Sequence, residues 1–145
     1  MYSTKLSVSV HILCMIALRG RPAVTSEDMA ASVQTNPAVV RRLMSRLKKA
    51  GLIRTRPRVG AVGLAKPSGE ISLWDIFRTV EPERRLFDLH TGTNLQCPVG
   101  ANIRVVMAGI CDKMQAGFET QLKSIYLSDI LRDLKERGVT SCLSQ

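Results

Sequence analysis

Two short helical patterns separated by a brief turn constrain the fold of this chain more than any other feature of its sequence. The first pattern begins at Thr25 or Ser26 and carries two carboxylates in its first turn, where they favour the positive end of a helix. The second runs from Asn36, which suits an N-cap, through Pro37 at the first helical position to Ala50. Two short helices joined in this way are the physical description of a helix-turn-helix.

The second pattern has one apolar face and one open face. At helical spacing, its buried stripe consists of Val40, Leu43, Met44 and Leu47. The residues that point elsewhere are Ala38, Val39, Arg41, Arg42, Ser45 and Arg46. A basic open face on the second helix of such a pair is suited to insertion into the major groove of DNA.

A glycine-bearing hairpin is predicted after Gly51, over residues 52–65. A hairpin that directly follows such a helix is a wing, and we expect the arginines Arg54, Arg56 and Arg58 to reach phosphates or a minor groove. Residues 70–80 then form a short helix with apolar residues that pack it back on the domain, and a structural role is sufficient for Trp74. The expected fold is mainly α with a small β wing.

Positive charge is concentrated around these elements. The chain has a net charge of +9, and between Asp28 and Glu70 it has no acidic residue. The nine basic residues of that stretch are Arg41, Arg42, Arg46, Lys48, Lys49, Arg54, Arg56, Arg58 and Lys66. A segment of this sign and density repels itself unless a polyanion neutralises it, so nucleic acid is the expected partner, with a solvated basic face as the alternative.

A long apolar repeat occupies the C-terminal part of the chain. It predicts one helix from Pro98 or Val99 to about Glu136, which at 1.5 Å per residue would be roughly 50 Å long. Since so small a domain leaves one side of such a helix uncovered, we expect a homodimer with two-fold symmetry. The expected organisation is a DNA-binding domain over 1–80, a connecting or sensor loop over 81–97, the dimerisation helix over 98–137 and a flexible tail over 138–145.

The cysteines and the N-terminus indicate the cellular compartment. The separations between Cys14, Cys97, Cys111 and Cys142 match neither a close-spaced zinc pattern nor a compact disulfide framework. No apolar run approaches the roughly 20 residues that span a bilayer. The N-terminal apolar stretch is interrupted by polar residues and has no small-residue cleavage site. We therefore expect a cytoplasmic protein with reduced thiols, no membrane association and no metal site.

The order of these elements resembles the Rrf2 family of bacterial transcription regulators. The resemblance covers the opening helix, the helix-turn-helix, the KKAGLI junction, the wing, the SLWDIFRTVE helix and the long final helix, so nearly the whole chain to Arg137. It implies a homodimer that binds double-stranded DNA with residues 36–50 and the wing. Cluster-binding members carry three cysteines before the long helix, whereas this loop has only Cys97, and the segment LQCPVGANI resembles the cluster-free branch. No iron-sulfur cluster or other cofactor is therefore expected.

The sequence suggests specific candidate residues for DNA binding and for redox sensing. Arg41, Arg42 and Arg46 are expected to pair with guanine edges or to clamp phosphates. Further DNA-binding candidates are Asn36, Ala38, Val39 and Ser45 on the helix, Arg54, Arg56 and Arg58 on the wing, and Lys5 and Ser7 near the N-terminus. Cys97, at the start of the long helix, is a candidate redox sensor, because the positive helix end favours a thiolate, and Cys142 is its candidate resolving partner.

The predicted function is a sequence-specific, homodimeric transcription regulator, acting as a repressor and responsive to oxidants through Cys97. None of the common catalytic motifs is present in the sequence, so the chain is not expected to be an enzyme. Two alternatives remain. One is a thiol-based redox enzyme built on Cys97, which would need a nearby base. The other is an interaction adaptor that kept the winged helix but lost DNA binding.

Overall fold

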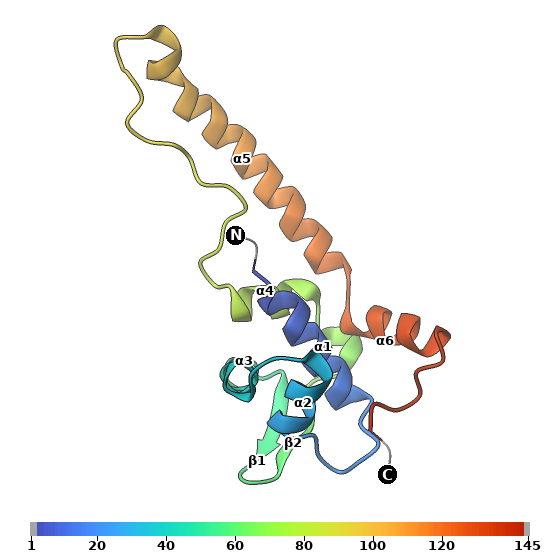
Figure 1. Cartoon of the computed structure of the whole chain (residues 1–145). Helices are drawn as coiled ribbons and strands as arrows, with labels where there is room; N and C mark the ends of the chain where they lie inside the picture. The colour runs from blue at the N-terminus through green and yellow to red at the C-terminus, as the bar shows by residue number, and fades with distance from the viewer. Residues whose placement is uncertain (1–2, 144–145) are drawn as a thin grey trace.

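The computed structural model describes residues 3–143, which form a helical domain with a two-stranded hairpin and one projecting helix (Figure 1). Along the chain the elements are α1 (Lys5–Ala17), α2 (Ser26–Val33), α3 (Pro37–Lys49), β1 (Ile53–Arg56), β2 (Gly60–Leu64), the 3-10 helix η1 (Ser68–Glu70), α4 (Leu73–Val80), α5 (Pro98–Ser124) and α6 (Leu127–Glu136). The expected fold class, mainly α with a small β wing, is confirmed.

Local capping fixes the two helices of the helix-turn-helix. Thr25 and Asp28 form a capping box, in which Thr25 Oγ1 accepts from the Asp28 amide at 3.1 Å and Asp28 Oδ2 accepts from the Thr25 amide at 3.0 Å. Asn36 Oδ1 accepts from the Ala38 amide at 2.8 Å, and Pro37 occupies the first turn of α3. Both helices therefore begin where the sequence predicted.

One hydrophobic core supports this motif. Helix α1 supplies the fully buried Ile12, Leu13 and Ile16, and α3 packs Val40 and Leu47 against them. The buried stripe predicted for α3 is confirmed except at Met44, which is only partly buried. Burial of this apolar face against α1 fixes the opposite face of α3 toward solvent.

The wing is an antiparallel hairpin tied to the chain between α1 and α2. Its register pairs Ile53 with Leu64 and Arg56 with Gly60. Val24 and Ala61 exchange two backbone hydrogen bonds of 2.9 Å, so that the linker before α2 pairs with β2. The hairpin is thereby held beside α2 and α3 instead of projecting freely.

The prediction of one continuous helix from residue 98 to about 136 is wrong. Helix α5 ends at Ser124, and Ile125 takes an extended backbone conformation. The Leu73 amide donates to Ile125 O at 2.8 Å, and the Leu127 amide donates to Ile71 O at 2.8 Å. This short bridge satisfies the backbone at the break, so α6 can turn back and bury Leu127 in the core. The sequence-based domain 1–80 therefore shares its core with α6.

Helix α5 projects from the domain, and the segment between α4 and α5 runs outward alongside it to its far end (Figure 1). Leu86 N donates to Gln115 Oε1 at 3.1 Å, and Arg85 Nη2 lies 2.6 Å from Asp112 Oδ1. The large apolar residues of α5 that are exposed are Val99, Ile103, Val105, Val106, Met107, Ile110 and Met114. Among residues 3–143, no helix combines the length and apolar content needed to cross a membrane.

The tail after α6 was predicted to be loose, and its described part is docked instead. Val139, Cys142 and Leu143 pack against the core, and the Cys142 amide donates to Leu18 O at 2.8 Å. A Cβ on Gly20 would lie 2.2 Å from Leu143 O, so the close approach of the tail requires glycine there. The last two residues of the predicted tail lie outside the described part of the chain.

Candidate nucleic-acid interface

A basic groove separates α3 from the hairpin. This wing groove has a volume of about 510 Å³ and lies between the start of α2, the exposed face of α3 and the tip of the hairpin. Its charged lining residues are Glu27, Arg41, Lys48, Arg56 and Arg58. Four cations and one carboxylate around an open groove make a surface suited to an anionic ligand.

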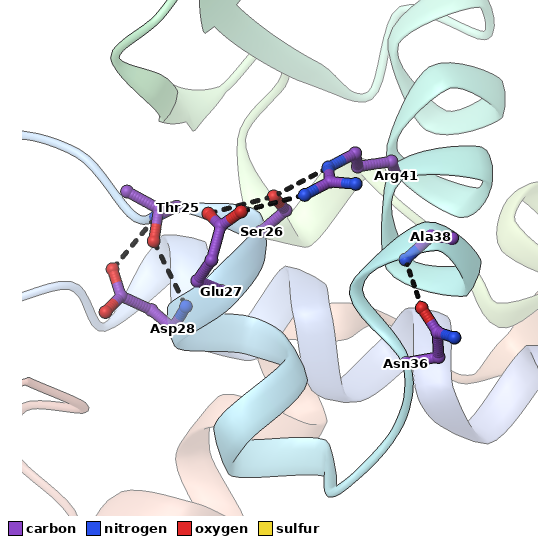
Figure 2. Close-up of polar contacts among 7 residues, drawn as sticks. All are labelled: Thr25, Ser26, Glu27, Asp28, Asn36, Ala38 and Arg41. Atoms are coloured by element: carbon purple, nitrogen blue, oxygen red, sulfur yellow. Dashed lines mark hydrogen bonds and ion pairs between the residues drawn. The ribbon is translucent and has the colours of Figure 1, made fainter.

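Arg41 crosses the groove toward α2 (Figure 2). Its Nη2 lies 2.8 Å from Glu27 Oε1, and its Nε donates to Ser26 Oγ at 3.3 Å. Hydrogen bonds from the Arg41 side chain, the backbone and Ser26 hold the pKa of the Glu27 carboxyl below its usual value. Both side chains remain more than half exposed, so their ion pair can exchange for another partner.

The wing tip places Arg58 in a conformation that usually requires glycine. The Val59 amide donates to Arg56 O at 3.1 Å, which closes a tight turn with Pro57 and Arg58 at its centre. Arg58 has φ of 63°, which matches the left-handed position of such a turn. A non-glycine residue here costs about 1–2 kcal/mol, and the conformation keeps the guanidinium at the tip of the hairpin.

A second groove, of about 500 Å³, lies on the other side of α3 and is lined by Lys5, Arg42 and Arg46. Lys5 Nζ lies 3.8 Å from Glu81 Oε1, and Arg46 Nη1 donates to Val80 O at 2.9 Å. Arg46 thus caps the last turn of α4, where carbonyls lack helical partners. Lys5 on α1 and Arg42 on α3 line the same groove, as a DNA-binding role requires, but Arg46 also has a structural contact.

Four of the predicted DNA-binding residues line neither groove: Asn36 and Ala38 at the start of α3, Ser7 on α1 and Arg54 on the hairpin. Ser7 is two positions after Lys5, and since a helix turns 100° per residue it faces another side of α1, near Cys142. Arg54 pairs with Gly63 toward the base of the hairpin and faces a hollow that Lys135 also lines. Neither Ser7 nor Arg54 is brought together with Arg41.

The other residues of α3 predicted to bind DNA differ in how far their side chains are exposed and free to contact DNA. Ala38 and Ser45 are exposed, whereas Val39 is partly buried against the core. Asn36 is exposed, but its side-chain oxygen is used as the N-cap of α3. Sequence reasoning missed Lys48, although its spacing of seven from Arg41 places both on one helix face.

The sequence also did not reveal that Glu27 is part of the wing groove. The sequence shows this carboxylate only as a favourable group at the start of α2. No local signal predicts its contact with Arg41, because the approach of the two helices depends on the tertiary packing of α2 against α3.

Cys97 is the exposed N-cap of α5. The nearby backbone amides of Gly100 and Val99, at the positive end of α5, hold the pKa of its thiol below the usual value. The structure therefore provides the local conditions that the sequence predicted for a thiolate at this position.

Cys142 lies beside Cys14 rather than Cys97. Both line a hollow of about 350 Å³ between α1 and α6. Burial raises the pKa of Cys14 to about 11, and burial also raises the pKa of Cys142. Within one chain, the start of α5 and the C-terminal tail lie at opposite ends of the molecule, so Cys97 cannot reach Cys142 there (Figure 1).

The cysteines do not provide a metal site in one chain. Among residues 3–143, no three His, Cys, Asp or Glu side chains come close enough together to hold a metal ion. Cys97 is exposed at the start of α5, whereas Cys111 is buried almost four turns further along that helix. An iron-sulfur cluster with three cysteine ligands from this chain does not fit this arrangement.

Comparison with known proteins identifies the family. A family model described as "Rrf2: Iron-dependent Transcriptional regulator" matches residues 2–133. The chain is 37% identical over 134 residues to a Bacillus subtilis (strain 168) protein described as "Putative HTH-type transcriptional regulator YwnA", covering 92% of this chain and 99% of that protein.

Solved structures show the same fold. The T. potens IscR structure has a TM-score of 0.70 and 24% identity, and the similarity covers all of this chain and 93% of that one. The oxidised form of Staphylococcus aureus CymR has a TM-score of 0.67 and 22% identity, over 90% of this chain and 95% of that one. The winged helix, the basic groove beside α3 and these similarities all indicate a DNA-binding protein. The chain belongs to the Rrf2 family of DNA-binding transcription regulators and is not an enzyme.

Proposed function

We propose that this protein is a cytoplasmic, homodimeric repressor that recognises specific duplex DNA through α3 and the wing. The observation that carries the proposal is the wing groove, where Arg41, Ser45 and Lys48 on α3 face Arg56 and Arg58 across an open hollow. Helix side chains of this kind read base edges in the major groove, and the arginines of the hairpin clamp the adjacent phosphates. Lys5 and Arg42, on the other side of α3, would add phosphate contacts.

The projecting helix supports the dimer. Apolar side chains such as Val106 (56% exposed) and Ile110 (45% exposed) lie along one face of α5, away from the core of their own domain. A contiguous apolar helix face of this kind is usually covered by another protein surface. A second copy covers it with the same face and places two α3 helices about a two-fold axis, as a palindromic DNA site requires.

Cys97 is the proposed sensor, and no cofactor is required. Its thiol is exposed, it begins the helix that would join the two copies, and its pKa is lowered by the amides of Gly100 and Val99. Oxidation at that position would alter the start of α5 and so the spacing of the two α3 helices. Cys142 could act as a resolving thiol only if the partner copy brings it to Cys97.

Selection from a random pool of DNA duplexes tests the main proposal. The purified, reduced protein is expected to enrich one palindromic sequence, with half-sites about 10 base pairs apart or a multiple of that spacing. A variant with Arg41→Ala and Lys48→Ala should enrich nothing under the same conditions while unfolding at the same temperature. If the wild-type protein enriches no sequence in reduced or oxidised form, an interaction adaptor becomes the better account.

Replacement of Cys97 tests the sensor separately. Mild peroxide is expected to weaken binding of the wild-type protein to the selected duplex, whereas Cys97→Ser should bind equally well with and without peroxide. Cys14→Ser is the matched control, because its thiol is buried and should leave the wild-type response intact. An unchanged oxidant response in Cys97→Ser would refute the sensing role and leave the DNA-binding role standing.

A further inference from the structure

Glu27 is the one carboxylate among the described residues that line the wing groove. It is 65% exposed and is paired with Arg41, which is 59% exposed (Figure 2). The helix-capping role at the start of α2 belongs to its neighbour Asp28, whose carboxylate bonds to the Thr25 amide. Capping therefore does not require Glu27, and its side chain is directed instead at the α3 residue that faces the DNA site.

The charge of Glu27 is unfavourable for DNA binding as such. A carboxylate among Lys48, Arg56 and Arg58 repels phosphates and removes part of the attraction that those cations provide. It also occupies Arg41, because the guanidinium must leave Glu27 Oε1 and Ser26 Oγ before it contacts DNA. Any DNA that engages Arg41 must therefore replace these two contacts.

Different DNA acceptors replace those contacts to different extents. A backbone phosphate can also accept two parallel bonds from an arginine, but its negative charge is repelled by the Glu27 carboxylate beside Arg41. A guanine edge offers O6 and N7 together and accepts two parallel bonds from an arginine. We infer that Glu27 is a specificity-determining positioning residue, which keeps Arg41 from phosphates and releases it to a bidentate base edge. This inference rests on the proposed function of the wing groove.

Glu27→Gln tests the inference, because it keeps the shape and removes the charge. The probes are the selected duplex and a scrambled duplex of the same length, titrated over a salt series. We expect affinity for the scrambled duplex to rise roughly fivefold and the magnitude of its salt slope to rise by about 0.9, as one more cation contacts phosphate. Affinity for the selected duplex should rise less than twofold, so the ratio between the two affinities falls.

Two control variants distinguish the positioning of Arg41 by Glu27 from a general effect of removing one negative charge. Glu70→Gln makes the same charge change at an exposed residue of η1, outside the groove, and should leave the specificity ratio unchanged. In an Arg41→Ala background, Glu27→Gln should change the specificity ratio no more than Glu70→Gln does, since no guanidinium remains to be positioned. Thermal unfolding of each variant confirms that the comparison is made between folded proteins.

The outcomes distinguish the inference from the function on which it rests. If the wild-type protein selects no duplex, the proposed function fails. If the wild-type protein is selective but Glu27→Gln and Glu70→Gln have the same specificity ratio, the function stands and the inference is overturned. An equal effect of Glu27→Gln with and without Arg41 would also overturn it, because the charge would then act directly on the DNA.

Discussion

The neighbours of each basic side chain divide the cations around α3 into two groups. Arg56 and Arg58 line the wing groove on the hairpin, and Arg41 enters it from α3. Lys5 and Arg46 contact Glu81 and the end of α4 on the other side. Sequence reasoning could predict which side chains are basic and which face of α3 is open, but it could not assign these tertiary partners.

Two substitutions at Arg58 distinguish the effect of its backbone conformation on stability from the effect of its charge on DNA affinity. Arg58→Gly removes the unfavourable positive φ and should raise the free energy of unfolding by about 1 kcal/mol, whereas Arg58→Ala should leave it nearly unchanged. Both variants should lose the same amount of affinity for DNA, because both remove the guanidinium. Urea unfolding and DNA titration check the two effects, and a larger loss of affinity in the glycine variant would show that turn conformation matters for binding.

Arg46 and Arg42 make a matched pair on adjacent turns of α3. Arg46→Ala leaves Val80 O without its donor and should lower the free energy of unfolding by about 1 kcal/mol. Arg42→Ala should change stability by less than half of that and reduce the magnitude of the salt slope of DNA binding by about 0.9. Equal stability losses in the two variants would contradict the capping contact.

At the scale of elements, the sequence predicted most of the helices and the hairpin because their signals are local. The Asn36-Pro37 start and the Thr25 cap are satisfied within a few residues. The break at Ile125 was missed, because the apolar repeat continues through it and its cause is pairing with Ile71 and Leu73, more than fifty residues away. Docking of the tail at Leu18 was missed for the same reason.

The capping box of α2 makes a pH-dependent contribution to stability. Hydrogen bonding to the Thr25 amide holds the pKa of Asp28 below its usual value. Its contribution is therefore present above the pKa of Asp28 in the unfolded chain and is lost as the pH falls through its lowered pKa in the folded protein. Asp28→Asn should cost about 1 kcal/mol at neutral pH and less in acid. Unfolding measured from pH 7 to pH 2 checks this, and a pH-independent cost would contradict it.

The loop before α5 closes against Gly100. Thr93 Oγ1 donates to Gly100 O at 2.6 Å, and a Cβ at Gly100 would lie 2.2 Å from Asn94 O. Gly100→Ala should displace this loop, weaken the amide contacts of Cys97 and raise its thiol pKa. The pH dependence of Cys97 alkylation by iodoacetamide measures that change. Gly109→Ala is the control, since a Cβ there meets nothing, and an equal shift in both variants would contradict the contact.

The described residues form a compact domain with one projecting helix, α5, whose apolar face is exposed. Val106→Asp should place a charge in the proposed dimer contact and convert the protein to a folded monomer. Arg104→Asp, about 200° around the same helix, should remain dimeric. Light scattering after gel filtration measures the mass, and a wild-type monomer or a dimeric Val106→Asp protein would contradict the proposed interface.

In the proposed function, α3 and the wing from each of two copies of the chain recognise one specific DNA sequence. The most direct measurement is the affinity of the reduced protein for the selected duplex and for a scrambled duplex, over a range of salt concentrations. We expect one dimer per duplex, a preference of at least about a thousandfold for the selected sequence, and affinity that falls steeply with salt. Equal affinity for the two duplexes, or binding that does not depend on salt, would contradict the proposed function.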